Sequence, residues 1–306
     1  MSLETLDDFP PGLPPRSWWC QQVHPRPNFY NSPDTLRCYE MARDQGSLVW
    51  RSVDPLCVVL QRYSSAPRFR LWALRGTAPD LLEIAGEYGA RSARPVTINN
   101  IDRETAQELL DLHPQGSLKV SEEILVSTED IVRSPDRFFN SRALTYLRRD
   151  RREMVYSLVD PGSPEVDSVI STWKSFLGHR HFRLSIVRDY VSNRWPYGYH
   201  YLGMRGGVPV CTQIIFPHPG APGHGIQAVE KSLNYSQMPG GRPGTSDANL
   251  FLACEDLVSR GIRYLNLGTY DGGAPGLGSR KRRFVHEVIH SYVFTTVYGG
   301  KHENRD

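Results

Sequence analysis

The sequence lacks any long apolar run. No stretch approaches the ~20 uncharged apolar residues that a bilayer-spanning helix needs. The first 16 residues, MSLETLDDFPPGLPPR, carry acids and prolines where a signal peptide has a basic start and an apolar core. Together these absences predict a cytoplasmic protein without an integral membrane segment.

Cysteine is also scarce, and metal-ligand spacing is missing. The five cysteines are scattered and none falls in a C-x-x-C pair, which excludes a disulfide framework and a zinc knuckle. His179, His181 and His200 have no carboxylate at ligand spacing, so no metal is predicted. The net charge of +3 is too small to imply nucleic acid by itself.

The length favours two domains. A chain of 306 residues exceeds one ordinary compact domain and suits two of roughly 120 to 190 residues. Proline and aromatic residues dominate the first 33 positions, which predicts an extended arm. We therefore expect an arm (1–33), an N-terminal domain (34–118) and a C-terminal domain (119–306).

Hydrophobic periodicity divides the N-terminal domain into helices and strands. The pattern predicts a helix, three strands, a helix that ends at Gly89, a strand and a last helix. These elements span residues 32–45, 47–53, 56–63, 69–76, 80–89, 96–101 and 103–113. The order predicts a mixed sheet covered by helices.

A second cycle of the same kind begins near residue 117. The segment 119–128 precedes a basic helix, which is followed by a capped amphipathic helix, a hairpin turning at Gly206-Gly207 and a further strand. A helix capped by Ser246 or Asp247 and closed by Gly261 then leads to a strand, a short basic helix and a final strand. The residue ranges, in the same order, are 136–152, 163–177, 197–216, 225–235, 247–261, 264–270, 276–285 and 288–298. Between the amphipathic helix and the hairpin, residues 181–191 read as one more helix or strand.

Four successive cations follow a glycine-rich turn near the C-terminus. The turn 272–278 leads through Ser279 to the run 280–283, which reads RKRR at the start of the short helix. Cations repel one another and the positive end of a helix dipole. Glycine-rich backbone and a helix start supply N–H donors, and Lys and Arg supply charge, so the pattern predicts a phosphate-binding site.

This region resembles a known family. It contains, in order, a helix ending in R-G, a strand reading Y-L-N-L-G, the motif G-L-x-x-x-K-x-x-F and an aromatic strand. This order is similar to the GNAT-like domain of the Fem-type peptidoglycan aminoacyltransferases and the phosphatidylglycerol lysyltransferases. The stretch ILVSTEDIVRSPDRFFNSRALTYLRRD resembles the segment before the catalytic domain of those lysyltransferases. The resemblance covers residues 120 to 300 in pattern and the N-terminal half in fold order.

The resemblance implies an α/β (α+β) protein of two GNAT-like folds in tandem, each a mixed, mostly antiparallel twisted sheet flanked by helices. It further implies an acyltransferase that moves an acyl or aminoacyl group from acyl-CoA or aminoacyl-tRNA onto an amine or hydroxyl. No tightly bound cofactor is expected. Because the R/Q-x-x-G-x-G/A loop of acetyl-CoA-dependent GNATs is missing, aminoacyl-tRNA is the preferred donor.

Site residues follow from the same resemblance and from position. Lys281 would stabilise the donor's carbonyl oxygen or terminal phosphate, since acyl transfer passes through an oxyanion. Glu230 and Asp271 are candidate general bases, and Tyr235 and Tyr270 are candidate acids for the leaving group. The expected donor phosphate-binding residues are Gly276, Gly278, Ser279, Arg280, Arg282 and Arg283.

A second basic cluster extends the predicted partners to nucleic acid. Between residues 133 and 152 there are seven Arg against two Asp, and the cluster of Arg148, Arg149, Arg151 and Arg152 suits tRNA or DNA. Two alternatives stay open. One is a GNAT of bacteriophage type that acylates or aminoacylates a base in DNA or RNA, and the other is a catalytically inactive GNAT fold used as a binding module.

Overall fold

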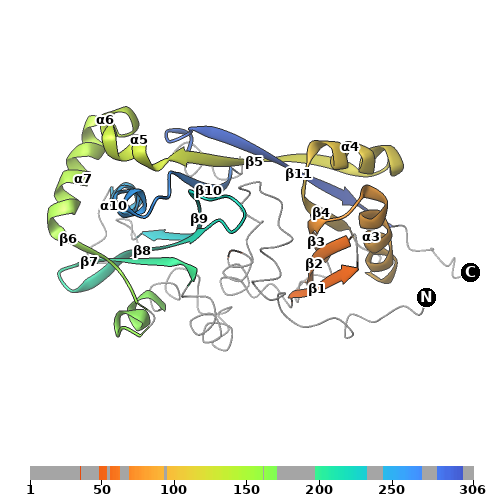
Figure 1. Cartoon of the computed structure of the whole chain (residues 1–306), viewed down its shortest axis with the longest axis horizontal. Helices are drawn as coiled ribbons and strands as arrows, with labels where there is room; N and C mark the ends of the chain where they lie inside the picture. The colour runs from red at the N-terminus through yellow and green to blue at the C-terminus, as the bar shows by residue number, and fades with distance from the viewer. Residues whose placement is uncertain are drawn as a thin grey trace, which may run out of the picture.

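The computed structural model contains two groups of strands that share one sheet (Figure 1). It describes residues 35, 48–53, 56–62, 69–92, 95–160, 162–170, 197–232, 244–270 and 281–298. The strands are β1 (Leu48–Val53), β2 (Leu56–Arg62), β3 (Phe69–Arg75), β4 (Val96–Ile101), β5 (Ser117–Ser127), β6 (Met154–Leu158), β7 (Tyr199–Arg205), β8 (Val208–Pro217), β9 (His224–Ser232), β10 (Tyr264–Tyr270) and β11 (Glu287–Thr296). The helices are α3 (Ala78–Ser92), α4 (Arg103–Leu112), α5 (Thr128–Arg133), α6 (Pro135–Phe138), α7 (Ser141–Glu153) and α10 (Thr245–Ser259).

A ladder between β5 and β11 joins the two groups. The strand order within the described part is β1-β2-β3-β4-β11-β5-β10-β9-β8-β7-β6. β11 pairs antiparallel with β5 from Glu287↔Leu125 to Thr295↔Ser117, and its C-terminal half also pairs with β4. β5 and β11 therefore cross from the β1–β4 group, which carries α3 and α4, to the β6–β10 group, which carries α5, α6, α7 and α10 (Figure 1).

Each group of strands has its own hydrophobic core. In the first group, α3 and α4 pack on β3, β4 and β11, and the last of these strands contributes Phe294. In the second group, α5, α7 and α10 pack on the sheet around the buried Ile124, Val126 and Phe251. β5 and β11 thus supply side chains to cores that lie at different ends of the same ladder. The predicted boundary between residues 118 and 119 falls inside β5, and the division into domains stays a prediction.

Most predicted elements within the described residues are confirmed. The three strands of the first meander, the hairpin between β7 and β8, and the strand Y-L-N-L-G-T-Y in β10 all form. Gly206 and Gly207 have φ of 56° and 78°, the left-handed values that a two-residue hairpin turn needs. Among the described helices, none has the length and apolar character required to span a bilayer. The N-terminal arm and most of the predicted helix 32–45 lie outside the described residues.

The single basic helix predicted over 136–152 is wrong. The chain forms α6, breaks at Phe139 and Asn140, and starts again as α7. Asn140 has extended backbone and its side chain accepts a hydrogen bond from Ala143 N, which is the geometry of a helix N-cap. Phe139 is buried against Phe251 and Phe284, so the break places this ring in the core.

The predicted end of α3 at Gly89 is also wrong, because the helix continues to Ser92. Gly89 is required by packing instead. A Cβ on Gly89 would overlap the Tyr298 ring, with the ring Cγ at 2.8 Å. The Tyr298 hydroxyl donates to the Leu82 carbonyl at 3.0 Å, so the tail after β11 is held against this helix.

Two glycines of α3 give a matched test of this packing. Gly89→Ala is expected to destabilise the fold by about 1–3 kcal/mol, because the methyl group overpacks against Tyr298. Gly86→Ala, whose Cβ would lie 3.4 Å from the same ring, is expected to be neutral or to stabilise by about 0.5–1 kcal/mol. Urea denaturation checks both. Equal stability of the two variants would contradict this account, and Tyr298→Ala should remove the penalty of Gly89→Ala.

A buried imidazole gives the fold a pH dependence. His200 on β7 has no exposed surface, and its ring lies edge-on to Phe216. Burial lowers the pKa of His200 to about 3. Below pH 6.5 the unfolded chain therefore binds a proton that the folded chain does not bind. His218 acts in the same direction, because its burial lowers its pKa to about 4.

We expect the free energy of unfolding to fall as the pH drops from 6.5 towards 4. His200 alone contributes a slope of up to about 1.4 kcal/mol per pH unit in this window. Urea titrations at several pH values measure the slope. His200→Gln should flatten it whatever its effect on stability at pH 7. An unaltered slope in His200→Gln would show that this imidazole does not titrate as described.

Candidate functional site

Two parallel neighbours in the sheet, β9 and β10, part from each other along their length. They pair at Tyr264↔His224, Leu265↔Gly225 and Asn266↔Ile226. Beyond these pairs β9 continues beside β8 to Ser232, while β10 continues beside β5 to Tyr270. The parting leaves residues 227–232 and 267–270 on two diverging strand ends.

The diverging end of β10 contains a bulge. Its register with β5 shifts between Asn266 and Thr269, and Gly268 has φ of 77°. The side chain of Asn266 accepts a hydrogen bond from Gly268 N at 2.7 Å, which fixes the turned backbone. Only glycine adopts this left-handed conformation at little cost, so the last residue of Y-L-N-L-G is dictated by the bulge.

Lys281 binds to this bulge. Its ammonium donates to the carbonyl oxygens of Leu267 at 2.6 Å and Thr269 at 3.1 Å. The lysine of the G-L-x-x-x-K motif therefore lies where β9 and β10 part. Its contacts in the structure are with backbone, and its predicted role in stabilising a donor stays a prediction.

Glu230 lies on the diverging end of β9. Its Oε1 accepts from the hydroxyls of Ser232 at 2.6 Å and Ser246 at 2.9 Å, and from Asn249 Nδ2 at 3.4 Å. Three donors on one oxygen fix the orientation of the carboxylate. The candidate base is thus tied to the start of α10, because Ser246 and Asn249 both belong to that helix.

The predicted caps of α10 are wrong. Its N-cap is Gly244, with φ of 91° and no side-chain hydrogen bond, and the helix begins at Thr245. Ser246 donates to Glu230, and Asp247 forms an ion pair with Arg283 at 3.4 Å. Both side chains that looked like caps are engaged by the candidate site.

Beneath Glu230 is a buried polar network that the sequence did not reveal. Asn249 and Gln213 have no exposed surface, and Gln213 Nε2 donates to the Asn249 carbonyl at 2.7 Å and to the Tyr156 hydroxyl at 2.8 Å. Tyr156 donates to Asn249 Oδ1 at 2.9 Å, and burial raises the pKa of its phenol. Gln227 extends the network by donating to Gln213 Oε1 at 2.7 Å. Such networks are rigid when their members are satisfied.

With this geometry in view, the chain can be compared with known proteins. No family model matches its sequence, and no match is found among curated proteins. A conserved protein of unknown function from Bacteroides thetaiotaomicron has a TM-score of 0.67 at 12% identity, and the alignment covers 94% of this chain and 99% of that one.

Two other structures have informative names. The C-terminal domain of a putative lysylphosphatidylglycerol synthetase from Agrobacterium fabrum has a TM-score of 0.58 at 12% identity, covering 86% of this chain and 91% of that one. L-PGS from Bacillus licheniformis has a TM-score of 0.59 at 15% identity, covering 85% of this chain and 90% of that one.

The chain has a GNAT-like fold, with a mixed sheet flanked by helices. This confirms the fold class that the sequence predicted. At 12–15% identity the likeness concerns the fold alone.

In this GNAT-like fold the predicted nucleic-acid cluster divides in two. Arg149 pairs with the fully buried Asp150 at 2.8 Å, and Arg151 pairs with Glu255 at 2.9 Å. Arg148 and Arg152 are exposed on α7, and within the described part of the chain no ion pair is found for either. Arg151 is exposed as well, but its guanidinium is engaged by Glu255, so Arg148 and Arg152 are the members of the cluster best placed for a phosphate backbone.

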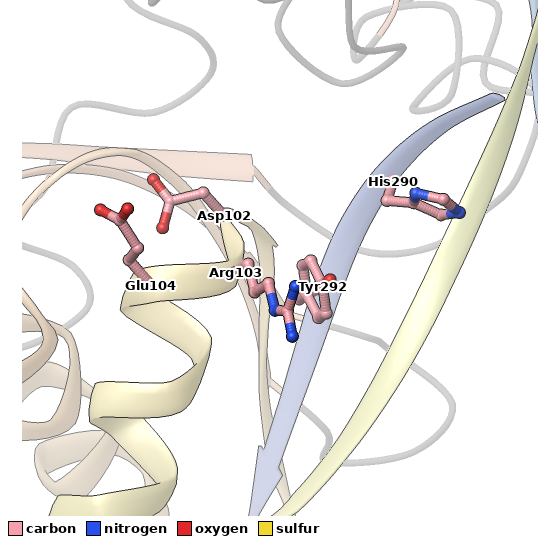
Figure 2. A pocket seen from close by; sticks show the side chains of 5 residues that line it. All are labelled: Asp102, Arg103, Glu104, His290 and Tyr292. Atoms are coloured by element: carbon pink, nitrogen blue, oxygen red, sulfur yellow. The ribbon is translucent and has the colours of Figure 1, made fainter. Parts of the chain in front are cut away.

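A surface pocket lies apart from the parted strands. It has a volume of about 220 Å³ and is lined by Asp102, Arg103, Glu104, His290 and Tyr292. Figure 2 shows Arg103 beside the Tyr292 ring, the two acids at the start of α4, and His290 on β11. The lining contains none of the predicted site residues, and β5 separates the pocket's strand β11 from β10.

Several predicted site residues are not placed. Arg282 and Arg283 are exposed next to Lys281, and their role in donor binding stays a prediction, while the other predicted catalytic and donor-binding residues lie outside the described residues. These are Asp271, Tyr235, Gly276, Gly278, Ser279 and Arg280, together with the side chain of Tyr270.

Proposed function

We propose that this chain is an acyltransferase that moves an acyl or aminoacyl group from aminoacyl-tRNA or acyl-CoA onto an amine or hydroxyl. The observation that carries the proposal is the parting of β9 and β10, with Glu230 on one strand and Lys281 bound to the other. The carboxylate is the candidate base, and the ammonium is the candidate cation for the donor carbonyl. The GNAT-like fold supports the same reaction class.

The chemistry follows from these two groups. Glu230, held by Ser232 and Ser246, takes the proton from the acceptor amine or hydroxyl as it attacks the donor carbonyl. The Lys281 ammonium stabilises the negative charge on the carbonyl oxygen. The leaving ribose hydroxyl or thiol takes a proton from Tyr235 or Tyr270, and Asp271 is the alternative base.

Aminoacyl-tRNA is the donor that the charges favour. Arg148 and Arg152 on α7 and Arg282 and Arg283 beside Lys281 are exposed cations, and together they suit an extended polyanion more than a single pyrophosphate. The missing pyrophosphate loop in the sequence supports the same choice. Modification of a nucleic-acid base remains the competing use of these arginines.

A binding module without activity is the second candidate. One observation favours it: the Lys281 ammonium already donates to two backbone carbonyls, so a purely structural role for this lysine is chemically sufficient. The two candidates differ in whether the donor ester or thioester is consumed.

We expect the purified full chain to consume one class of donor in the presence of amine and hydroxyl acceptors. Lys281→Ala should lower kcat by about 10²–10³ because it removes one oxyanion-stabilising group. Glu230→Gln should lower kcat by about 10²–10⁴ because it removes the general base. Release of tRNA from radiolabelled aminoacyl-tRNA and of thiol from acyl-CoA measures both reactions.

The matched control is Lys119→Ala, which removes an exposed lysine from the far part of β5 and should leave turnover unchanged. Full activity in Lys281→Ala and Glu230→Gln would reject this assignment of the site. No consumption of any donor by a folded chain that still binds tRNA or CoA would favour the binding module.

The choice of donor has its own test on α7. Arg148→Ala combined with Arg152→Ala should weaken tRNA binding and reduce the slope of log K against log salt by about 0.7–0.9 for each phosphate that is no longer neutralised. Fluorescence anisotropy at several salt concentrations measures this slope, with Lys119→Ala as the control. Affinity for acyl-CoA should not change. Tighter binding of duplex DNA than of tRNA would instead favour the base-modifying alternative.

A further inference from the structure

A buried carboxylate lies next to the bulge of β10. Glu123 on β5 has no exposed surface and pairs in register with Thr269 on one side and Ile289 on the other. Its Oε2 accepts a hydrogen bond from Asn266 Nδ2 at 2.8 Å. Burying a carboxylate is costly unless donors surround it, so its presence in the middle of the sheet requires an explanation.

Asn266 connects this carboxylate to the bulge. Its amide donates to Glu123 while its carbonyl oxygen Oδ1 accepts from Gly268 N at 2.7 Å. One amide therefore has both ends occupied, and neither end can turn without losing a hydrogen bond. The side-chain orientation of Asn266 is set by Glu123, and the backbone at Gly268 is set by Asn266.

The bulge in turn presents two carbonyls to Lys281. The carbonyls of Leu267 and Thr269 flank Gly268, and both accept from the Lys281 ammonium. β9 no longer pairs with β10 at these residues, so the lysine takes up backbone acceptors where the strands have parted. The ammonium lies where it does because the backbone between residues 266 and 269 is turned.

We propose that Glu123 is a positioning residue that acts on Lys281 through Asn266 and the bulge. The carboxylate orients the amide, the amide holds Gly268, and the two flanking carbonyls hold the ammonium. The proposal rests on the proposed function in one respect only, namely that Lys281 acts on a donor. The positioning itself is a property of the protein and can be measured without turnover.

The test uses the reactivity of Lys281 towards an acetylating N-hydroxysuccinimide ester in the full chain. The sequence has five lysines, so mass spectrometry can follow each of them. The rate at Lys281 is divided by the rate at the exposed Lys119 in each variant. Asn266→Ala and Glu123→Leu each break the connection. We expect the ratio to rise about two- to tenfold, because the loss of one hydrogen bond leaves the Lys281 ammonium accessible to the reagent for more of the time.

Conservative and control variants separate positioning from general destabilisation. Glu123→Gln keeps an acceptor for the Asn266 amide, so its ratio should stay closer to the natural chain than that of Glu123→Leu. Glu122→Gln changes the neighbouring half-exposed carboxylate, which faces His290, and should leave the ratio unchanged. A variant that only loosens the fold also raises the rate at Lys281, because Lys119 is exposed already. The free energy of unfolding in urea is therefore measured for each variant, and the ratio is compared between Glu123→Leu, Asn266→Ala and a variant of equal stability that lies away from the bulge, such as Gly89→Ala.

An unchanged ratio in Asn266→Ala and in Glu123→Leu would overturn the proposal, whether or not the chain has activity. An increased ratio without consumption of any donor would retain the positioning role and reject the transferase. Where turnover is found, the Glu123 variants should lower kcat with little change in donor KM. Equal effects on kcat and KM would assign Glu123 to donor binding instead.

Discussion

The antiparallel ladder between β5 and β11 is the interaction on which the rest of the structure depends. It is the central pair of the sheet, and it supplies Ile124 and Val126 to one core and Phe294 to the other. Because the two cores share these strands, a shift in the ladder register would move side chains at both ends at once. The same ladder holds Glu123 between Thr269 and Ile289, so the candidate site is built from its central part.

The site itself results from interrupted pairing. Parallel strands that pair along their whole length satisfy each other's backbone groups and leave no space between them. Here β9 and β10 stop pairing after Ile226 and Asn266, and the unpaired end needs other partners. Lys281 supplies donors for β10, while the serines and Asn249 hold Glu230 on β9. The polar groups that hold the parted strands are thus the same groups to which the proposed reaction assigns the base and the cation.

Sequence periodicity predicted most of the described elements, but it did not predict their ends or the break between α6 and α7. The strands of both halves and the Gly206-Gly207 turn follow from local patterns that each element contains in itself. Gly89 misled because a glycine in a helix signals an end, whereas here it makes room for Tyr298, more than 200 residues away. Ser246 and Asp247 misled because a polar residue before a helix resembles a cap, whereas Glu230 and Arg283 engage them. In each case a contact distant in sequence decides the role.

The same limit applies to the site. Lys281 and Glu230 stood out through motif and position, but no sequence pattern marks Glu123, Asn266 or Gln213 as connected groups. The N in Y-L-N-L-G was one available signal, because an asparagine inside an otherwise apolar strand needs hydrogen-bond partners. Its partners lie on β5 and within the bulge, and only the three-dimensional register of β5 and β10 brings them together.

Magnitudes indicate which cations of the RKRR run belong to the fold. Arg283 is partly exposed and its pair with Asp247 spans 3.4 Å, so this pair contributes about 0–1 kcal/mol. Lys281 makes two hydrogen bonds from a charged group to backbone carbonyls, and such bonds contribute about 1.5–3 kcal/mol each. The lysine is therefore a structural part of the opening, whereas the exposed arginines beside it add little to stability. The predicted start of a helix at these cations is wrong, because Arg282 is the last helical residue and Arg283 lies in the turn that follows, where the helix dipole favours positive charge. In the proposed reaction the donor phosphates lie at the exposed arginines and the reacting carbonyl lies nearer to Lys281.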